Sequence, residues 1–520
     1  MRSSIYRRER YDSSETEPLL PAIPVLTQNN EGTGNNGMAE VGVSQSVLVE
    51  PREEGGRKLP QYIAALSATL GALAAGSVLG WSSPVIYKIT QANSTEYAFD
   101  VSSSQGDWVS SLVNLGAAAV CFPIGLIMDA IGRKTTMLLL VIPFTLGWLL
   151  ITLATNVGML MAGRFITGVA GGAFCVTAPA YTSEIAQDSI RGSLGSFFQL
   201  MVTVGILFAY AVGSYTSVLI FNILCTLIPI IFGVIFFFMP ESPKYLVNKE
   251  KFDNAKDALI KLRGSNYDVD SELNLLREKY EESITNKVSF LSAITKKTAL
   301  KAILICYTLM IIQQLSGINA VIFNTSQIFD SSGATIPAAI GTIIIGVIQV
   351  IATLVSSLVV DKLGRRILLL FSVLVMCLCS TALGVFFFLK DTHGGESSIV
   401  QAISWLPLLS LSLFIIAFSL GSGPIPWMMA GDLCLIDIKA FVSSTAGTLN
   451  WLLSFTVTRT FNSLNTAIGS GQVFWIFAGI MVAAFIFIFF VVPETKGKSV
   501  DEIQLLLGAE QQPQTNGEKK

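Results

Sequence analysis

Uncharged carboxamide side chains occur in this sequence inside long apolar stretches that otherwise carry almost no polar groups. The clearest case is QQLSGIN at residues 313–319, which follows the apolar run KAILICYTLMII. An amide without a hydrogen-bond partner in hydrocarbon costs several kcal/mol, so these groups must face the interior of a helix bundle or a wet cavity. The amides of this kind are Gln199, Gln313, Gln314, Asn319, Gln349 and Asn450.

An amide offers a donor and an acceptor side by side, which suits a sugar hydroxyl, itself both donor and acceptor. Aromatic rings would supply the other half of such a site, because the C–H faces of a pyranose pack on them. Phe418, Trp427 and Trp451 are placed for this. Two other interpretations stay open: a single amide can join two helices, and a Trp can anchor a span at the membrane interface.

The stretch GSGPIPW from Gly421 interrupts one apolar run. Pro424 and Pro426 remove two backbone donors and kink a helix, and the neighbouring glycines add freedom. The pattern predicts a hinge, although kinks without a function also occur.

The bulk composition identifies a membrane protein. The chain has 520 residues, of which 52% are hydrophobic and 13% charged, with a mean hydropathy of +0.61. Apolar runs of about 20 residues are long enough to cross a bilayer. We identify twelve, at about 62–84, 105–127, 135–155, 159–181, 193–213, 218–239, 300–325, 337–360, 367–389, 401–428, 441–461 and 472–492.

The spans divide into two groups of six that repeat each other. MDAIGRKTTML after the second span matches VDKLGRRILLL after the eighth, and PESPKYL matches PETKGKS. A duplicated six-span unit is typical of carriers that rock two bundles about a central site. The predicted fold is therefore all-α, with twelve transmembrane helices in two six-helix bundles. Its predicted parts are a disordered tail (1–59), an N-terminal bundle (60–240), a linker with short amphipathic helices (241–299), a C-terminal bundle (300–495) and a tail (496–520).

The repeated loops place basic residues near carboxylates at span ends. An Arg there can reach the acids of neighbouring helices, which predicts a latch between the two bundles on the cytosolic side. The alternative for any one loop is a solvated basic turn. The residues concerned are Asp129, Arg133, Asp361 and Arg365 in the loops, with Glu184, Glu241, Asp432 and Glu494 as acids.

The placement of basic residues predicts that both termini are cytosolic. Only Lys88, Arg164, Lys390 and Arg459 then lie on or near the outer side. No apolar signal segment follows the first Met, so residues 1–59 are expected to be a disordered tail. None of the seven cysteines falls in an external loop, and no disulfide is expected.

Two short motifs concern modification and sorting. Asn93, in NST, lies in the first external loop and is a candidate glycosylation site. Glu15 with Leu19 and Leu20 has the acidic dileucine spacing of an endosomal sorting signal, which predicts a clathrin adaptor as a partner, although such strings also arise by chance. The plasma membrane and endosomal or lysosomal membranes are both open as locations.

The missing residue types restrict the function. No Asp or Glu lies in the middle of a span, whereas a proton-coupled carrier needs a titratable group in its path. This predicts a uniporter driven by the solute gradient. No metal-ligand cluster, nucleophile or acid pair indicates an enzyme, a cofactor or a metal site, and nothing indicates nucleic-acid binding. A proton symporter and a non-transporting sensor are the alternatives, and the 14 residues after Leu506 are short for a signalling tail.

Together these motifs resemble the sugar porter family of the major facilitator superfamily, and within it the insect facilitated trehalose carriers and the endosomal hexose carriers of animals. The resemblance covers residues 60–506 and follows the family's order: GRFITG, YTSE followed by Arg191 and Gly192, PESPKYL, QQLSGIN, DKLGRR, GPIPW and PETKG. It implies a facilitative carrier of glucose-like sugars or trehalose. It also assigns sugar contacts to the amides named above and to Trp427 and Trp451, and it adds Arg191 to the latch.

Several positions depart from the family pattern. The two aromatic gate residues after the span 7 asparagine are here Phe323 and Asn324. Asp432 stands where Glu is usual and Lys439 where Arg is usual, which implies a weaker latch in the second half. Ser419 replaces an acid of the mammalian glucose carriers, so the choice between a monosaccharide and trehalose stays open.

Overall fold

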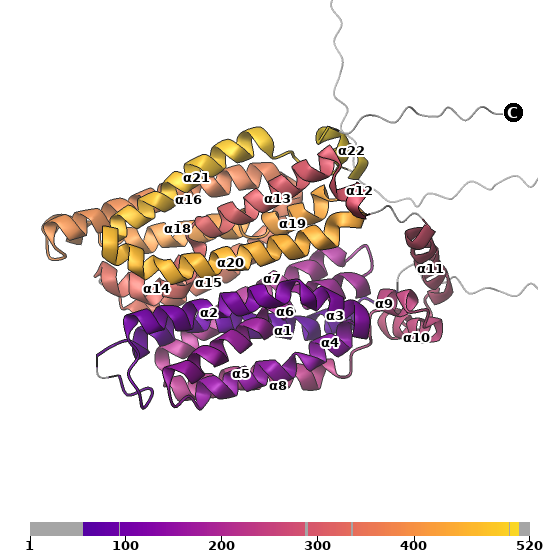
Figure 1. Cartoon of the computed structure of the whole chain (residues 1–520), viewed down its shortest axis with the longest axis horizontal. Coiled ribbons are helices and arrows are strands. Elements are labelled where there is room, and N and C mark those ends of the chain that lie inside the picture. The colour runs from indigo at the N-terminus through magenta and orange to yellow at the C-terminus, as the bar shows by residue number, and fades with distance from the viewer. Residues whose placement is uncertain (1–55, 93, 286–289, 334–335, 499, 509–520) are drawn as a thin grey trace, which may run out of the picture. The chain divides into compact units, whose positions relative to one another are not determined.

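The computed structural model describes residues 56–92, 94–285, 290–333, 336–498 and 500–508 (Figure 1). Within these ranges every regular element is a helix. The glycosylation candidate Asn93 and the sorting motif of Glu15, Leu19 and Leu20 lie outside the described residues, as does nearly all of the predicted N-terminal tail.

The first six spans form the N half of the bundle. Its helices are α1 (Leu59–Ile89), α2 (Ser103–Cys121) with α3 (Pro123–Ile131), α4 (Arg133–Leu139) with α5 (Val141–Thr152), α6 (Val157–Ile185), α7 (Arg191–Tyr215) and α8 (Val218–Phe236).

The last six spans form the C half, and two of them are broken. Its helices are α13 (Lys297–Leu315) with α14 (Ile318–Ser332), α15 (Ala338–Leu363), α16 (Arg365–His393), α18 (Leu406–Leu420) with α19 (Ile425–Leu433), α20 (Ile436–Ile468) and α21 (Ser470–Val491). A short α17 (Ser398–Ala402) lies between α16 and α18.

Ten of the described helices or continuous helix pairs are long and apolar enough to cross a membrane, and the bent pair α2–α3 makes an eleventh. The twelfth predicted span is α20, whose 33 residues are long enough but include many Ser, Thr and Asn side chains. The prediction of an all-α membrane protein is confirmed. Each of the twelve predicted spans corresponds to one of these helices or helix pairs.

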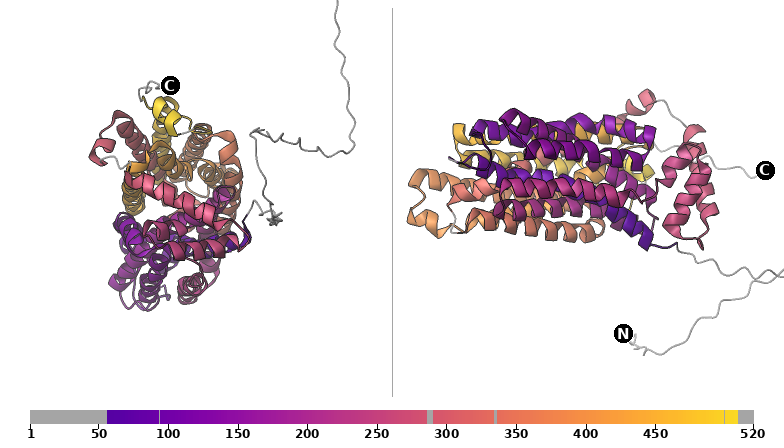
Figure 2. Two further views of the ribbon diagram at one scale, coloured as in Figure 1. Left: turned by 90° about the vertical axis from the view of Figure 1, so that its right-hand side faces the viewer. Right: turned by 90° about the horizontal axis from the view of Figure 1, so that it is seen from below.

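The polar linker forms short helices at one end of the bundle, which we call the linker end. They are α9 (Pro243–Asn248), α10 (Phe252–Arg263), α11 (Val269–Thr285) and α12 (Phe290–Ile294), and α22 (Val500–Leu506) lies at the same end (Figures 1 and 2). Buried Ala255 and Leu259 of α10 pack against α9 and α11, as their helical spacing predicts. Arg263 joins this group to the N half, because its guanidinium donates to Ile185 O at 2.8 Å while pairing with Glu272.

Close helix packing in the N half depends on glycine. A Cβ on Gly76 of α1 would lie 2.0 Å from the carbonyl oxygen of Val202 on α7, and one on Gly205 of α7 would lie 2.2 Å from that of Leu73 on α1. The two backbones therefore touch where they cross, as small residues allow in membrane helices. Gly171 on α6 differs, since its nearest neighbour would be Ala75 at an ordinary 3.6 Å.

Substituting these glycines separates close packing from helix propensity. We expect Gly76→Ala to destabilise the protein by roughly 1–3 kcal/mol, because the methyl group forces α1 away from α7. Gly171→Ala should leave stability unchanged or raise it slightly, since alanine favours the helix. Thermal unfolding of both variants in detergent measures the difference. Equal midpoints for the two variants would contradict the close crossing.

Candidate functional site

Four of the predicted amides form one continuous hydrogen-bonded chain within the C half. Asn319 Nδ2 on α14 donates to Gln314 Oε1 at 2.6 Å, and Gln314 Nε2 on α13 donates to Asn450 Oδ1 at 2.8 Å. Asn450 Nδ2 on α20 donates to Gln313 Oε1 at 2.7 Å. Asn319 also donates to Ser454 Oγ at 2.7 Å. The chain joins two spans, the broken α13–α14 span and α20, through neutral donors and acceptors.

Gln313 lies at the end of that chain and holds the break between α18 and α19. Its Nε2 donates to the carbonyl oxygens of Ser422 and Gly423, both at 2.7 Å. The backbone N–H of Ser422 donates to Ser372 Oγ on α16 at 3.0 Å. The break at the predicted hinge, with Pro424 and Pro426 just beyond it, therefore has its exposed backbone groups satisfied by side chains.

A cavity of about 170 Å³ lies between α7, α15 and the α18–α19 pair. Nothing lies within 4 Å of the position that a Cβ would take at Gly192 or Gly195, which form its wall toward the linker end. None of the described residues that line it is charged. Its polar lining consists of Ser196, Gln199, Thr353, Ser356, Ser357 and Ser419.

Gln199 and Gln349 are not part of the hydrogen-bonded amide chain, and they have side-chain groups without a hydrogen-bond partner within the described residues. Gln199 lines the cavity from the N half, and its side chain makes no hydrogen bond within the described residues. Gln349 lies one turn from the cavity residue Thr353 on α15, so the two share a helix face. Gln349 is 3% exposed, and within the same residues its Oε1 has no partner.

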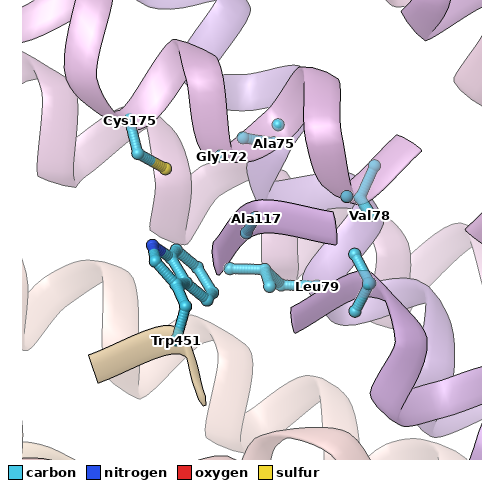
Figure 3. Close-up of a pocket in the computed structure, with 10 residues that line it drawn as sticks. Ala75, Val78, Leu79, Ala117, Gly172, Cys175 and Trp451 are labelled. Atoms are coloured by element: carbon cyan, nitrogen blue, oxygen red, sulfur yellow. The ribbon is translucent and has the colours of Figure 1, made fainter. Parts of the chain in front are cut away.

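The predicted aromatic residues are not gathered on the larger cavity. Trp451 does not line it and points toward Leu79, Ala117 and Cys175 of the N half (Figure 3). The hollow there measures about 10 Å³, which is no more than one water molecule needs. Trp427 is 43% exposed and packs beside Gly447 of α20.

Phe418 is half-buried and packs beside Gly423 at the α18–α19 break, adjacent to the cavity residue Ser419. The gate positions Phe323 and Asn324 are both buried on α14. Asn324 has non-helical dihedral angles (φ −122°, ψ 19°), so α14 is kinked at this residue. The kink is a feature that the apolar pattern of the sequence does not reveal.

The ties between the halves lie in the part of the bundle away from the linker end, which we call the opposite end. Tyr87 OH of α1 donates to Asp330 Oδ1 of α14 at 3.0 Å. Asn462 Nδ2 of α20 donates to Asp107 Oδ1 of α2 at 2.6 Å, and the Arg459 guanidinium lies 3.9 Å from the same carboxylate. The halves are therefore held together at the opposite end.

The predicted latch residues lie elsewhere, and the ion pairs described for them are within each half. In the N half, Arg133 pairs with Glu184 at 2.8 Å and with Asp129 at 3.0 Å. In the C half, Arg365 lies 3.6 Å from Asp432. Arg191 pairs with Asp188 at the surface. Asp361 is in the last turn of α15, and its side chain is outside the described part. A latch between the halves remains a prediction for a state closed at the linker end.

The two remaining acids, Glu241 and Glu494, each cap the N-terminus of a helix, one in each half. Glu241 accepts the backbone N–H groups of Arg133 and Lys134, which begin α4. Glu494 accepts those of Arg365 and Arg366, which begin α16, at 2.9 and 3.0 Å. Carboxylates at helix N-termini are stabilised by these free N–H groups. Repetition in the sequence thus reflects a repeated helix cap.

Glycine is required beside each cap. Gly132 (φ +101°) and Gly364 (φ +95°) precede α4 and α16, and a Cβ on them would lie 2.4 and 2.7 Å from a carboxylate oxygen of Glu241 and Glu494. The left-handed backbone and the close carboxylate both exclude a side chain.

Arg164 is one of the four basic residues predicted to lie on or near the outer side. Its guanidinium is fully buried and donates to Val78 O at 2.9 Å and to Ser82 Oγ at 2.7 Å. It also lies over the Trp81 ring, 4.6 Å from the centroid. Within the described residues no carboxylate is within 4.0 Å of it. The predicted span boundaries already place Arg164 about two turns inside α6, but the sequence does not reveal which groups bind its guanidinium.

Comparison with known proteins gives a consistent result. A family model described as "Sugar (and other) transporter" matches residues 65–507. The chain is 38% identical over 445 residues to a protein of Culex quinquefasciatus named facilitated trehalose transporter Tret1, covering 85% of both chains. It is 35% identical to a longer protein of the same name from Anopheles gambiae, covering 97% of this chain and 62% of that one.

The fold is also similar to solved structures. One is the inward-open conformation of the xylose transporter XylE from E. coli, with a TM-score of 0.69 and 23% identity, covering 85% of this chain and 98% of that one. This likeness shows that the two chains share the major facilitator fold.

The Glu494 cap gives a pH-dependent test. Burial raises the pKa of Glu494, but backbone N–H groups of Lys496, Arg365, Arg366 and Thr495 outweigh this and hold the pKa below its ordinary 4.5. A depressed pKa stabilises the fold above the ordinary value and loses that contribution as the pH falls through the folded-state value. We expect Glu494→Gln to lower the free energy of unfolding by about 1 kcal/mol at pH 7, and by less below pH 4.5.

Unfolding midpoints in detergent between pH 7 and pH 3.5 measure this difference. Glu396→Gln, at an exposed glutamate, is the matched control and should change nothing. A wild-type advantage that is independent of pH would show that Glu494 does not act as a charged cap.

Proposed function

Because this chain belongs to the sugar transporter family, we propose that it carries trehalose or a hexose down its concentration gradient by alternating access. It is a multi-pass membrane protein and a transporter rather than an enzyme. The names of its insect relatives favour trehalose, and the neutral cavity suits any small polyol. The observation that carries the proposal is this uncharged, hydroxyl- and amide-lined cavity between two halves that, within the described residues, hydrogen-bond to each other only toward the opposite end.

Amides that still have an unused donor or acceptor are better candidates for sugar contacts than amides that are fully hydrogen-bonded within the protein. Gln199 and Gln349 have unused amide groups at or beside the cavity. In the amide chain, and within the described residues, Gln314 keeps one N–H and Asn319 keeps its carbonyl oxygen, whereas Gln313 uses both N–H groups and its oxygen. We therefore assign Gln313 to holding the α18–α19 hinge, with Gln314 and Asn319 presented to the sugar. Phe418, Trp427 and Trp451 are assigned to packing on the sugar in other states of the cycle.

The surroundings of Arg164, a cation buried inside the N half, favour uniport over proton symport. A proton-coupled carrier needs a group that changes charge within its path. Within the described residues, the direct hydrogen-bond and ring partners of Arg164 are two backbone carbonyls, a hydroxyl and an indole ring, none of which titrates near neutral pH. Asp107 is buried but lies at the opposite end, where Asn462 and Arg459 hold it.

In the proposed cycle the two bodies are the predicted bundles, residues 60–240 and 300–495. This conformation opens toward the linker end, which the distribution of basic residues assigns to the cytosol. Phe323 and Asn324 gate the opposite end, and the latch residues join the halves when the linker end closes. Asn93 glycosylation, and delivery to an endosomal membrane through Glu15, Leu19 and Leu20 by a clathrin adaptor, belong to the same proposal.

Uptake into proteoliposomes distinguishes the modes of transport. We expect labelled trehalose or glucose to equilibrate across the membrane and not to accumulate when a pH gradient is imposed. Competition by unlabelled trehalose, glucose and fructose identifies the substrate. Accumulation above the external concentration, driven by protons alone, would overturn uniport, and no saturable uptake of any of the three sugars would overturn the proposal.

Substituting the amides tests the binding site. Gln314→Ala and Asn319→Ala should each weaken sugar binding by roughly 1–3 kcal/mol, because a hydroxyl loses its partner. Gln401→Ala, at an exposed glutamine of α17, should bind as the wild type does. Equilibrium binding to purified, folded variants is the measurement. Unchanged affinity in both site variants would remove these residues from the site.

A further inference from the structure

The non-helical dihedral angles of Asn324 imply that the kink in α14 releases one backbone donor and one backbone acceptor from the helix. In a regular α-helix the N–H of Ser326 would donate to the carbonyl oxygen of Ile322, four residues earlier. The non-helical Asn324 lies between them. Both residues are buried, with Ile322 6% and Ser326 3% exposed, so neither group can turn to bulk water.

Both released groups are satisfied by side chains of the N half. Tyr210 OH of α7 donates to Ile322 O at 2.7 Å. The N–H of Ser326 donates to Ser83 Oγ of α1 at 3.0 Å. Tyr210 and Ser83 are themselves buried, at 0% and 2% exposed. One helical hydrogen bond within the C half has thus been exchanged for two bonds between the halves.

Local side chains support the kinked form. Asn324 Nδ2 donates to Ala320 O at 2.9 Å, and Thr325 Oγ1 donates to Val321 O at 2.7 Å. Side chains that bond to carbonyls four residues back compete with the helical N–H groups and bend helices. The kink is therefore prepared within α14 and completed by α1 and α7.

We infer that Tyr210 and Ser83 are positioning residues of the transport cycle, and that α14 exchanges backbone partners as the opposite end opens. In this conformation Ile322 O and Ser326 N–H bond to Tyr210 and Ser83. When the halves separate there, the two groups bond to each other and α14 straightens. The inference rests on the proposed alternating-access function, but it concerns the conformational equilibrium and not the substrate.

The exchange solves a physical problem of gating within a membrane. A gate whose contacts include buried backbone groups would leave those groups without partners on opening, at a large cost. A donor and an acceptor that can pair with each other avoid this cost in both states. The element is then bistable, as a switch between two packed arrangements requires.

The equilibrium between this conformation and one open at the opposite end can be measured with two reporter cysteines, introduced one at a time into the full-length protein in nanodiscs. Thr458→Cys is on α20, 2% exposed and facing Asn114 of the N half, so it becomes accessible only when the opposite end opens. Gly192→Cys is at the open cavity wall, where a side chain meets nothing. Labelling rates with a membrane-impermeant maleimide are compared with those of the protein without a reporter.

We expect Tyr210→Phe and Ser83→Ala each to raise the labelling rate of Thr458→Cys about fivefold to tenfold, because each leaves one backbone group unsatisfied in this conformation only. The rate at Gly192→Cys should fall or stay constant. A rise at both reporters would indicate general loosening and would overturn the inference, as would an unchanged rate at Thr458→Cys.

The double variant provides the decisive measurement. With both side chains removed, Ile322 O and Ser326 N–H can pair with each other even while the halves stay together. The labelling rate should therefore rise by clearly less than the product of the two single effects. Effects that multiply would show two independent contacts and would overturn the exchange.

Tyr307→Phe is the matched control, because Tyr307 OH bonds to Thr445 Oγ1 within the C half. It should leave labelling at Thr458→Cys unchanged, and an increase equal to that of Tyr210→Phe would count against the inference. Because labelling needs no sugar, failure of the exchange can be told apart from failure of the proposed transport activity.

Discussion

Hydrocarbon offers no hydrogen-bond partners, so every break in a membrane helix must be satisfied from within the protein. Two such breaks shape this molecule. At the α18–α19 break the freed groups bond to Gln313 and Ser372, both in the C half. At the α14 kink the partners are Tyr210 and Ser83, both in the N half. The first break is therefore independent of the separation of the halves, whereas the second depends on it.

The same requirement divides the amides into two groups. Gln313, Gln314, Asn319 and Asn450 satisfy one another and fix how α13, α14 and α20 lie around the broken span. Gln199 and Gln349 come from the two helices on either side of the cavity and keep free groups. A polar cluster that is satisfied internally can hold a shape, while unsatisfied amides at a cavity can receive a hydroxyl.

Hydropathy predicted all twelve spans because membrane crossing depends on local composition. It could not predict partners, which depend on how each helix is rotated. In this conformation Glu184 and Glu241 of its own half surround Arg133, because the duplicated unit carries its acids with it. Trp451, predicted to contact the sugar, here lies at the contact with α1, α2 and α6. The α14 kink depends on Tyr210 and Ser83, which are far away in the sequence.

Among the spans, α20 is less apolar than the criterion that the other eleven meet. Two of its polar side chains face α2, through Asn462 with Asp107 and Thr458 with Asn114, while Asn450 and Ser454 bond to α13 and α14. Such a segment gains little from partitioning into lipid by itself, because its polar groups need protein partners. During synthesis the earlier spans are already present when α20 leaves the ribosome. We therefore expect the insertion of α20 to depend on spans that precede it, including α2 of the first bundle.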